Sequence, residues 1–66
     1  MLFANFKFIA DNVKEVIVDD THCIINLKTG ERFTTYSVPK TIQEFIKYVP
    51  NESYTDENGE NHYIAK

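Results

Sequence analysis

The sequence predicts a small α+β domain, an antiparallel sheet of three to four strands packed by one amphipathic helix at about residues 38–49, with a C-terminal hairpin as a further element. Two observations predict this class. Short runs of β-branched and aromatic residues alternate with turn residues in the first half of the chain. One later stretch has apolar residues at helical spacing. We expect residues 1–66 to form a single domain.

The first two strands are expected before residue 20. Leu2–Ala10 is rich in phenylalanine, which favours a strand, and Asp11–Asn12 is a turn signal. Val13–Asp19 follows as a β-branched run. Asp19–Thr21 then predicts a tight connection to the next strand.

A hairpin is expected next. His22–Leu27 alternates most clearly, and Glu31–Tyr36 carries the threonines and aromatics of a second strand. Between these runs, Gly30 supplies the positive φ that the turn needs. Cys23 alternates onto an apolar face, so we interpret it as a small buried side chain.

The helix is predicted from four apolar residues at positions i, i+3, i+4 and i+7: Ile42, Phe45, Ile46 and Val49. Pro50 ends it, because proline disfavours helix in the residue before it.

Two helix starts compete. In the favoured one Ser37 caps the helix and Pro39 lies in its first turn. Substitution of Ser37 by alanine would then cost roughly 0.5–2 kcal/mol of stability. In the alternative, Thr41 and Glu44 form a capping box.

The segment 51–66 is either a mobile acidic tail or a hairpin. Asn58–Gly59 is a strong turn signal, with Tyr54 and Tyr63 in the two prospective arms.

Two short motifs suggest a serine acyl-transferase. Lys28–Thr29–Gly30 spells K-T-G, and Ser37–Val38–Pro39–Lys40 fits S-x-x-K. Such enzymes hold these motifs on separate elements of a large domain. Here the motifs are a few residues apart and proline interrupts one of them. We interpret both as coincidence, predict no catalytic residue, and expect a protein that is not an enzyme.

No cofactor or metal site is expected. A single cysteine excludes sites made of cysteine pairs, and Asp56–Glu60 lacks the ligand positions of a calcium loop. His22 and His62 could bind a metal only with two more ligands brought close, and no spacing in the sequence indicates them.

The charge of the chain argues against nucleic acid as a partner. The net charge is −3, and the seven basic residues are scattered. Acidic residues crowd the C-terminal segment, including Asp56, Glu57 and Glu60. They form either a solvated surface or a patch for a basic partner. No secretory signal or bilayer-length apolar run is present, so we expect a cytoplasmic protein without membrane contact.

The run from Phe6 to Val49 resembles a strand–strand–hairpin–helix unit of two bacterial families, the FlbD-type flagellar accessory proteins and the first half of the LytTR DNA-binding domain. The matching positions are Val13, Val16, Ile25, Leu27, Gly30, Phe33, Ser37, Ile42 and Ile46. Each is a core or turn position, so the resemblance implies a fold and transfers no functional residue.

The function expected is that of a small protein-binding accessory or inhibitory factor of bacterial or phage type. Four tyrosines are candidate contacts because tyrosine is enriched at interfaces, although packing at the core rim also explains them: Tyr36, Tyr48, Tyr54 and Tyr63. An open edge strand would allow a homodimer. The alternative is a minimal LytTR-like nucleic-acid-binding regulator, with Lys28 and Arg32 as its contacts.

Overall fold

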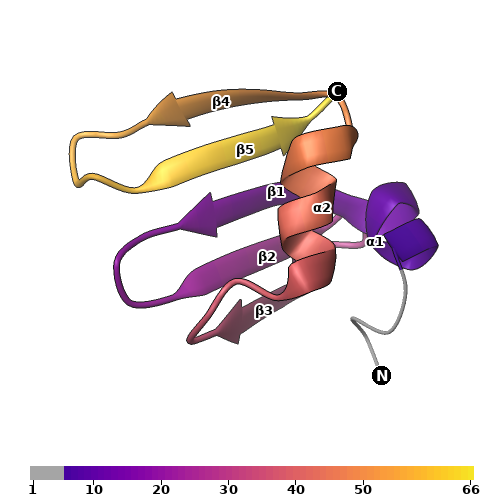
Figure 1. Cartoon of the computed structure of the whole chain (residues 1–66), viewed down its shortest axis with the longest axis horizontal. Coiled ribbons are helices and arrows are strands. Elements are labelled where there is room, and N and C mark those ends of the chain that lie inside the picture. Colours follow the sequence, from indigo (N-terminus) through magenta and orange to yellow (C-terminus); the bar gives the residue numbers. More distant parts are fainter. Residues whose placement is uncertain (1–5) are drawn as a thin grey trace.

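The computed structural model describes residues 6–66 and shows an α+β fold (Figure 1). The predicted α+β class with an antiparallel sheet is confirmed, but the sheet has five strands and a second helix is present. The elements in chain order are α1 (Phe6–Asn12), β1 (Val13–Val18), β2 (Cys23–Leu27), β3 (Arg32–Thr35), α2 (Lys40–Tyr48), β4 (Asn51–Thr55) and β5 (Asn61–Ala65).

The sheet order is β3-β2-β1-β5-β4, and all neighbouring strands are antiparallel. The central strand β1 pairs on one side with β2, which follows it in the chain, and on the other side with β5. The segment 51–66 takes the hairpin form, with Gly59 in the turn at φ 82°. Gly30 has φ 97° in the β2–β3 turn, as the sequence predicts.

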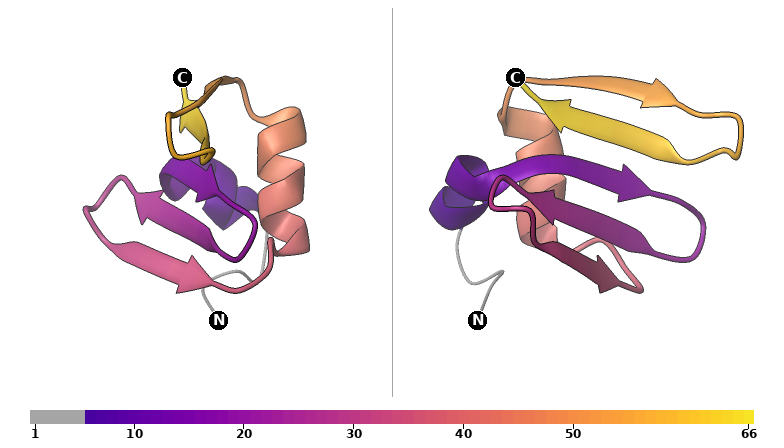
Figure 2. Two further views of the ribbon diagram at one scale, coloured as in Figure 1. Left: turned by 90° about the vertical axis from the view of Figure 1, so that its left-hand side faces the viewer. Right: turned by 180° about the vertical axis from the view of Figure 1, so that it is seen from behind.

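The core lies between α2 and one face of the sheet (Figure 2). Helix α1 packs beside α2, at the end of the sheet where β1 begins. Cys23, which pairs with Val18 at the other end of β1, is fully buried, as predicted, and burial raises the pKa of its thiol. The fully or nearly fully buried side chains are Ile9, Val13, Val16, Cys23, Ile25, Leu27, Ile42 and Phe45.

The strand expected at Leu2–Ala10 is wrong over the described residues. Residues 1–5 lie outside the described part, and Phe6–Asn12 forms α1. Phe6 and Ile9 are three positions apart, so one helical face brings both against the core. Lys7 donates to Asp11 at 3.0 Å, the i, i+4 spacing of a helix. The predicted turn at Asp11–Asn12 is the last part of this helix.

Helix α2 begins at Lys40, later than the favoured start. Pro39 is the N-cap residue, and no side chain caps the helix, so the predicted cap by Ser37 is wrong. The reason is Pro39: a residue before proline avoids the helical region, so Val38 cannot form the first helical turn that a Ser37 cap requires.

The capping box at Thr41 does not form either. The Thr41 hydroxyl is buried and has no hydrogen-bond partner among the described residues. At the other end, Val49 is extended, and the Asn51 side-chain amide donates to the carbonyls of Ile46 and Val49 at 3.0 and 2.7 Å. Asn51 thereby satisfies carbonyls that the end of a helix leaves free.

Candidate functional site

One face of the sheet is left uncovered by both helices of the described part (Figure 2). We call it the open face, and the strand register arranges its side chains in two rows across the sheet. The first row is Thr34, Ile24, Ile17, His62 and Tyr54. The second row is Arg32, Asn26, Glu15, Ile64 and Glu52.

The open face has an apolar centre. Ile17 and Ile24 lie directly opposite each other on β1 and β2, and both are half-buried. Ile64 is exposed, and none of the three packs against the buried core. Such a cluster on a sheet surface is typical of a binding face.

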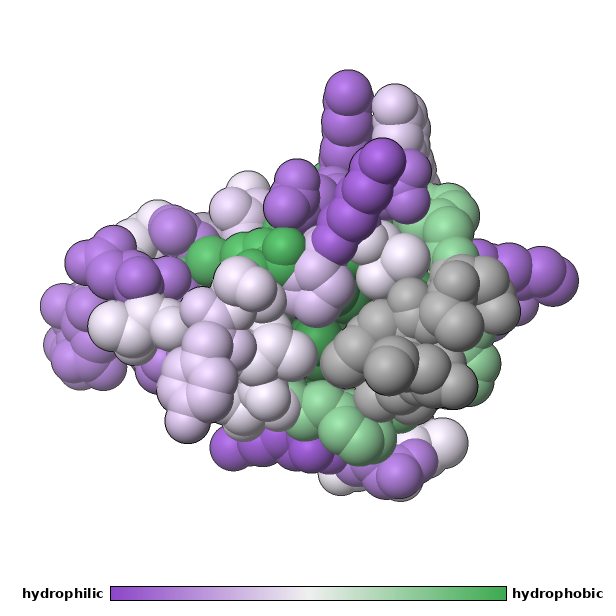
Figure 3. Space-filling view, turned by 60° about the horizontal axis from the view of Figure 1, so that its bottom comes forward, coloured by the Kyte–Doolittle hydropathy of each residue, from purple (hydrophilic) through white to green (hydrophobic). Residues whose placement is uncertain are grey.

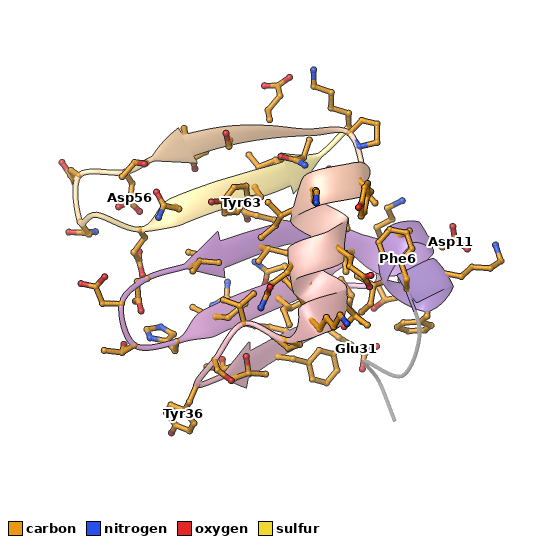
Figure 4. All side chains as sticks on the ribbon, in the orientation of Figure 1. Phe6, Asp11, Glu31, Tyr36, Asp56 and Tyr63 are labelled. Carbon is orange, nitrogen blue, oxygen red and sulfur yellow. The ribbon has the colours of Figure 1, made fainter. Side chains whose placement is uncertain are left out.

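Two loops meet at the end of the sheet away from α1, because Val18 of β1 pairs with Asn61 of β5. We call residues 19–22 and 56–60 together the tip. These loops hold five carboxylates and no lysine or arginine. Figure 3 shows the hydrophilic surface of this end on the left, and Figure 4 labels Asp56 there.

Each loop of the tip is organised by one aspartate. Asp19 Oδ1 accepts the backbone amides of Thr21 and His22, both at 2.8 Å, and these hydrogen bonds lower the pKa of Asp19. Asp56 Oδ1 accepts the backbone amides of Asn58 and Glu60 at 2.8 and 3.0 Å in the same manner. Both carboxylates are therefore held in fixed positions by their own loops.

His62 is held between two carboxylates. Its Nδ1 lies 2.9 Å from Glu15 Oε2 and its Nε2 lies 2.8 Å from Asp56 Oδ2. The ring also stacks on Tyr54, with centroids 4.5 Å apart, and only 12% of the side chain is exposed. The hydrogen bond with Asp56, followed by that with Glu15, raises the pKa of His62, and the bond with His62 lowers the pKa of Asp56.

Glu60 lies between two groups of potential ligands. The ligand atoms of Asp56, Glu60 and His62 all lie within 4.8 Å of one another, and so do those of Asp19, His22 and Glu60. The Glu60 carboxylate makes no hydrogen bond or ion pair with any of residues 6–66, although it is half-buried. Glu60 is thus a half-buried carboxylate without a hydrogen-bond partner in the described part of the chain, close to two aspartates and two imidazoles.

The four predicted tyrosines do not share one surface. Tyr36 is 92% exposed and projects from the loop after β3, whereas Tyr63 lies over β5 beside α2 and packs against the core (Figure 4). Tyr48 is exposed near the end of α2, with Lys47 Nζ 5.3 Å from its ring centre. Tyr54 is half exposed on the open face.

The predicted acidic residues do come together, since Asp56, Glu57 and Glu60 all belong to the tip. The two predicted cations lie elsewhere. Lys28 lies in the β2–β3 turn, at the end of the sheet opposite the tip. Its backbone amide donates to the carbonyl of Asn12. Arg32 is on the open face and donates to Asn26 Oδ1 at 2.9 Å.

Sequence reasoning did not place Glu15, Asp19, His22 and His62 in one site. Glu15 and His62 are 47 residues apart, and only the β1–β5 pairing brings them together. The available signal was alternation within each strand, which puts Glu15 and Ile17 on the same face but says nothing about the neighbouring strand.

No helix among residues 6–66 is long and apolar enough to cross a membrane. No protein-family model, no curated protein and no solved structure matches the chain. The resemblance to the FlbD-type and LytTR families therefore stays a prediction, and function has to be argued from the geometry of the open face and the tip.

Proposed function

We propose that this chain is a non-enzymatic protein-binding module that docks through the open face of its sheet. The observation that carries the proposal is the apolar centre formed by Ile17, Ile24 and Ile64 on a face that no described helix covers. Burial of apolar surface is the main favourable contribution to most protein association.

The charges around this centre define the kind of partner. Glu15 and Glu52 lie beside Ile64, and the acidic tip continues from the same face. A partner with an apolar patch bordered by basic side chains matches this pattern, because complementary charge speeds association and selects the partner. Tyr54 adds an amphipathic ring at the rim.

No observation favours the nucleic-acid alternative. Lys28 lies at the end opposite the tip, and Arg32 already donates to Asn26. Duplex binding depends on several phosphate contacts from clustered cations, and the second row of the open face has one arginine and two glutamates.

The test compares two substitutions in the β4–β5 hairpin that add the same charge to opposite faces. Ile64→Glu places a carboxylate on the open face, and Ser53→Glu places one on the exposed helix side of β4. The immobilised chain and both variants are presented to an extract of the native host, and the captured proteins are identified by mass spectrometry. Circular dichroism verifies that both variants fold.

We expect Ile64→Glu to abolish capture of a specific basic protein that both the wild type and Ser53→Glu retain, and we expect added salt to weaken that capture. Equal capture by the two variants would contradict the proposal. Sedimentation of the pure chain tests the other occupant of the open face. A dimer that Ile64→Glu dissociates would assign this face to a second copy and overturn the proposal.

A further inference from the structure

The tip has a second property, which does not depend on the docking surface. Around Glu60 lie two other carboxylates and two imidazoles, from the two loops of the tip and from the adjoining start of β5: Asp19, His22, Asp56 and His62. Acidic groups alone are common on surfaces. The imidazoles distinguish this cluster, because nitrogen and oxygen donors together suit transition metals rather than calcium or magnesium.

The group around His62 is the better organised one. Glu15 holds Nδ1 at 2.9 Å, which directs Nε2 towards Asp56 and fixes the plane of the ring, and Tyr54 stacks on that ring. Metal-binding histidines typically have this arrangement, with the second ring nitrogen donating to a carboxylate. Glu15 would therefore be a positioning residue and Nε2 the ligand atom.

The carboxylates of Asp56 and Glu60 complete the ligand set with His62. Asp56 is fixed through Oδ1 by two backbone amides, which leaves Oδ2 directed at His62. Glu60 is half-buried and its carboxylate has no partner among residues 6–66. A cation at this point would compensate the charge of Glu60 and bridge it to Asp56.

We propose that Asp56, Glu60 and His62 bind one divalent transition-metal ion of the zinc class. The ligand atoms lie within 4.8 Å of one another, against about 3.4 Å in a tetrahedral site with bonds near 2.1 Å. Binding therefore requires Glu60 to move closer, and it requires His62 Nε2 and Asp56 Oδ2, which are 2.8 Å apart, to separate by about 0.6 Å. The ion occupies the position of the proton between His62 Nε2 and Asp56, and that proton passes to solvent. Water completes the coordination.

The experiment titrates the full chain with zinc alone in metal-free buffer and follows binding by calorimetry. Cobalt absorption reports the coordination geometry. Glu60→Gln and Glu57→Gln form a matched pair, because both remove one charge from the same loop and only Glu60 belongs to the proposed site. His62→Gln and His22→Gln form a second pair that separates the two groups of ligands. Circular dichroism verifies folding, and Glu60→Gln breaks no hydrogen bond of its carboxylate.

We expect one zinc ion per chain, with affinity reduced about tenfold or more in Glu60→Gln and His62→Gln. In Glu57→Gln and His22→Gln we expect a change within about twofold, since neither side chain belongs to the proposed ligand set. Three results would each overturn the proposal: no binding up to about 1 mM zinc, equal weakening by Glu57→Gln and Glu60→Gln, or loss in His22→Gln with retention in His62→Gln. Magnesium binding as tight as zinc would also contradict it.

Discussion

Replacing Thr41 by valine should make the protein more stable. Thr41 lies in the first turn of α2, and its hydroxyl oxygen is buried without a partner in the described part of the chain. Burying a hydroxyl without a hydrogen bond costs about 1–3 kcal/mol by protein mutational data. Valine has the same branched shape and a similar helix propensity, so the substitution removes this cost while preserving the packing.

The expected gain from Thr41→Val is large relative to the total free energy of unfolding. A chain of 66 residues has a free energy of unfolding of about 3–10 kcal/mol at 0.05–0.15 kcal/mol per residue. With a urea m-value of about 1 kcal/mol per molar, a gain of about 1–2 kcal/mol raises the midpoint of urea unfolding by about 1–2 M. Circular dichroism during urea titration measures this shift directly.

Two controls isolate the hydroxyl. Thr34→Val removes an exposed hydroxyl from β3 and should leave stability nearly unchanged. Thr41→Ser keeps the hydroxyl, loses the methyl group and should destabilise. A lower midpoint in Thr41→Val would refute the reasoning, because it would show that the hydroxyl is hydrogen-bonded after all.

Three further predictions concern the cap residues and the histidine. Ser37→Ala should change the free energy of unfolding by no more than about 0.5 kcal/mol, because α2 begins after Pro39 without a side-chain cap. A loss of about 1 kcal/mol or more, which is typical of a lost N-cap, would contradict this helix start. Asn51→Ala should cost about 1–2 kcal/mol in urea unfolding, since two carbonyls at the end of α2 lose their donor, and Asn51→Asp, which has no amide to donate, should behave similarly. The pKa of His62 is raised, so its stabilising effect is complete below pH 6.5 and is lost as the pH rises through the higher folded-state value. In a chelating buffer the urea midpoint should therefore fall with increasing pH above 6.5, and Glu15→Gln should flatten this dependence; equal slopes in the two proteins would contradict the role of the Glu15 hydrogen bond.

Local signals predicted the centre of the fold well. Gly30 adopts the positive φ of a turn between two strands, and Ile42 and Phe45 are buried on one face of α2. These features depend on a few neighbouring residues. Period-two alternation, a turn glycine and helical spacing are each visible within a short window of sequence.

Competing local signals account for the errors. Phe6, Phe8 and Ala10 alternate as in a strand, whereas Phe6 and Ile9 have the spacing of a helix, and packing against α2 selects the helix. At Ser37, the residue type favours a cap, but the restriction that Pro39 imposes on Val38 prevails.

The site was less predictable than the fold. Asp56, Glu57 and Glu60 form part of the acidic tip, as their clustering in the sequence indicates. The position of His62 depends on the pairing of β5 with β1. Which strand β5 pairs with cannot be predicted from the residue pattern of β5 or of β1 alone. A pairing across 47 residues leaves no periodicity that a reader of the sequence can detect.

The position of β1 at the centre of the sheet has a consequence for folding. The β1–β2–β3 meander closes through short turns, whereas β5 reaches β1 only after a long loop has been closed. The β4–β5 hairpin is therefore the unit expected to detach first in local opening, and amide exchange would detect this as lower protection in β5 than in β2. When the hairpin detaches, the backbone of β1 from Glu15 to Val18 is exposed as an unpaired strand edge. This edge is rich in β-branched residues and is therefore suited to pairing with other chains. We therefore expect the hydrogen bond between His62 and Glu15, which joins β5 to β1, to disfavour aggregation by keeping the hairpin paired with that edge.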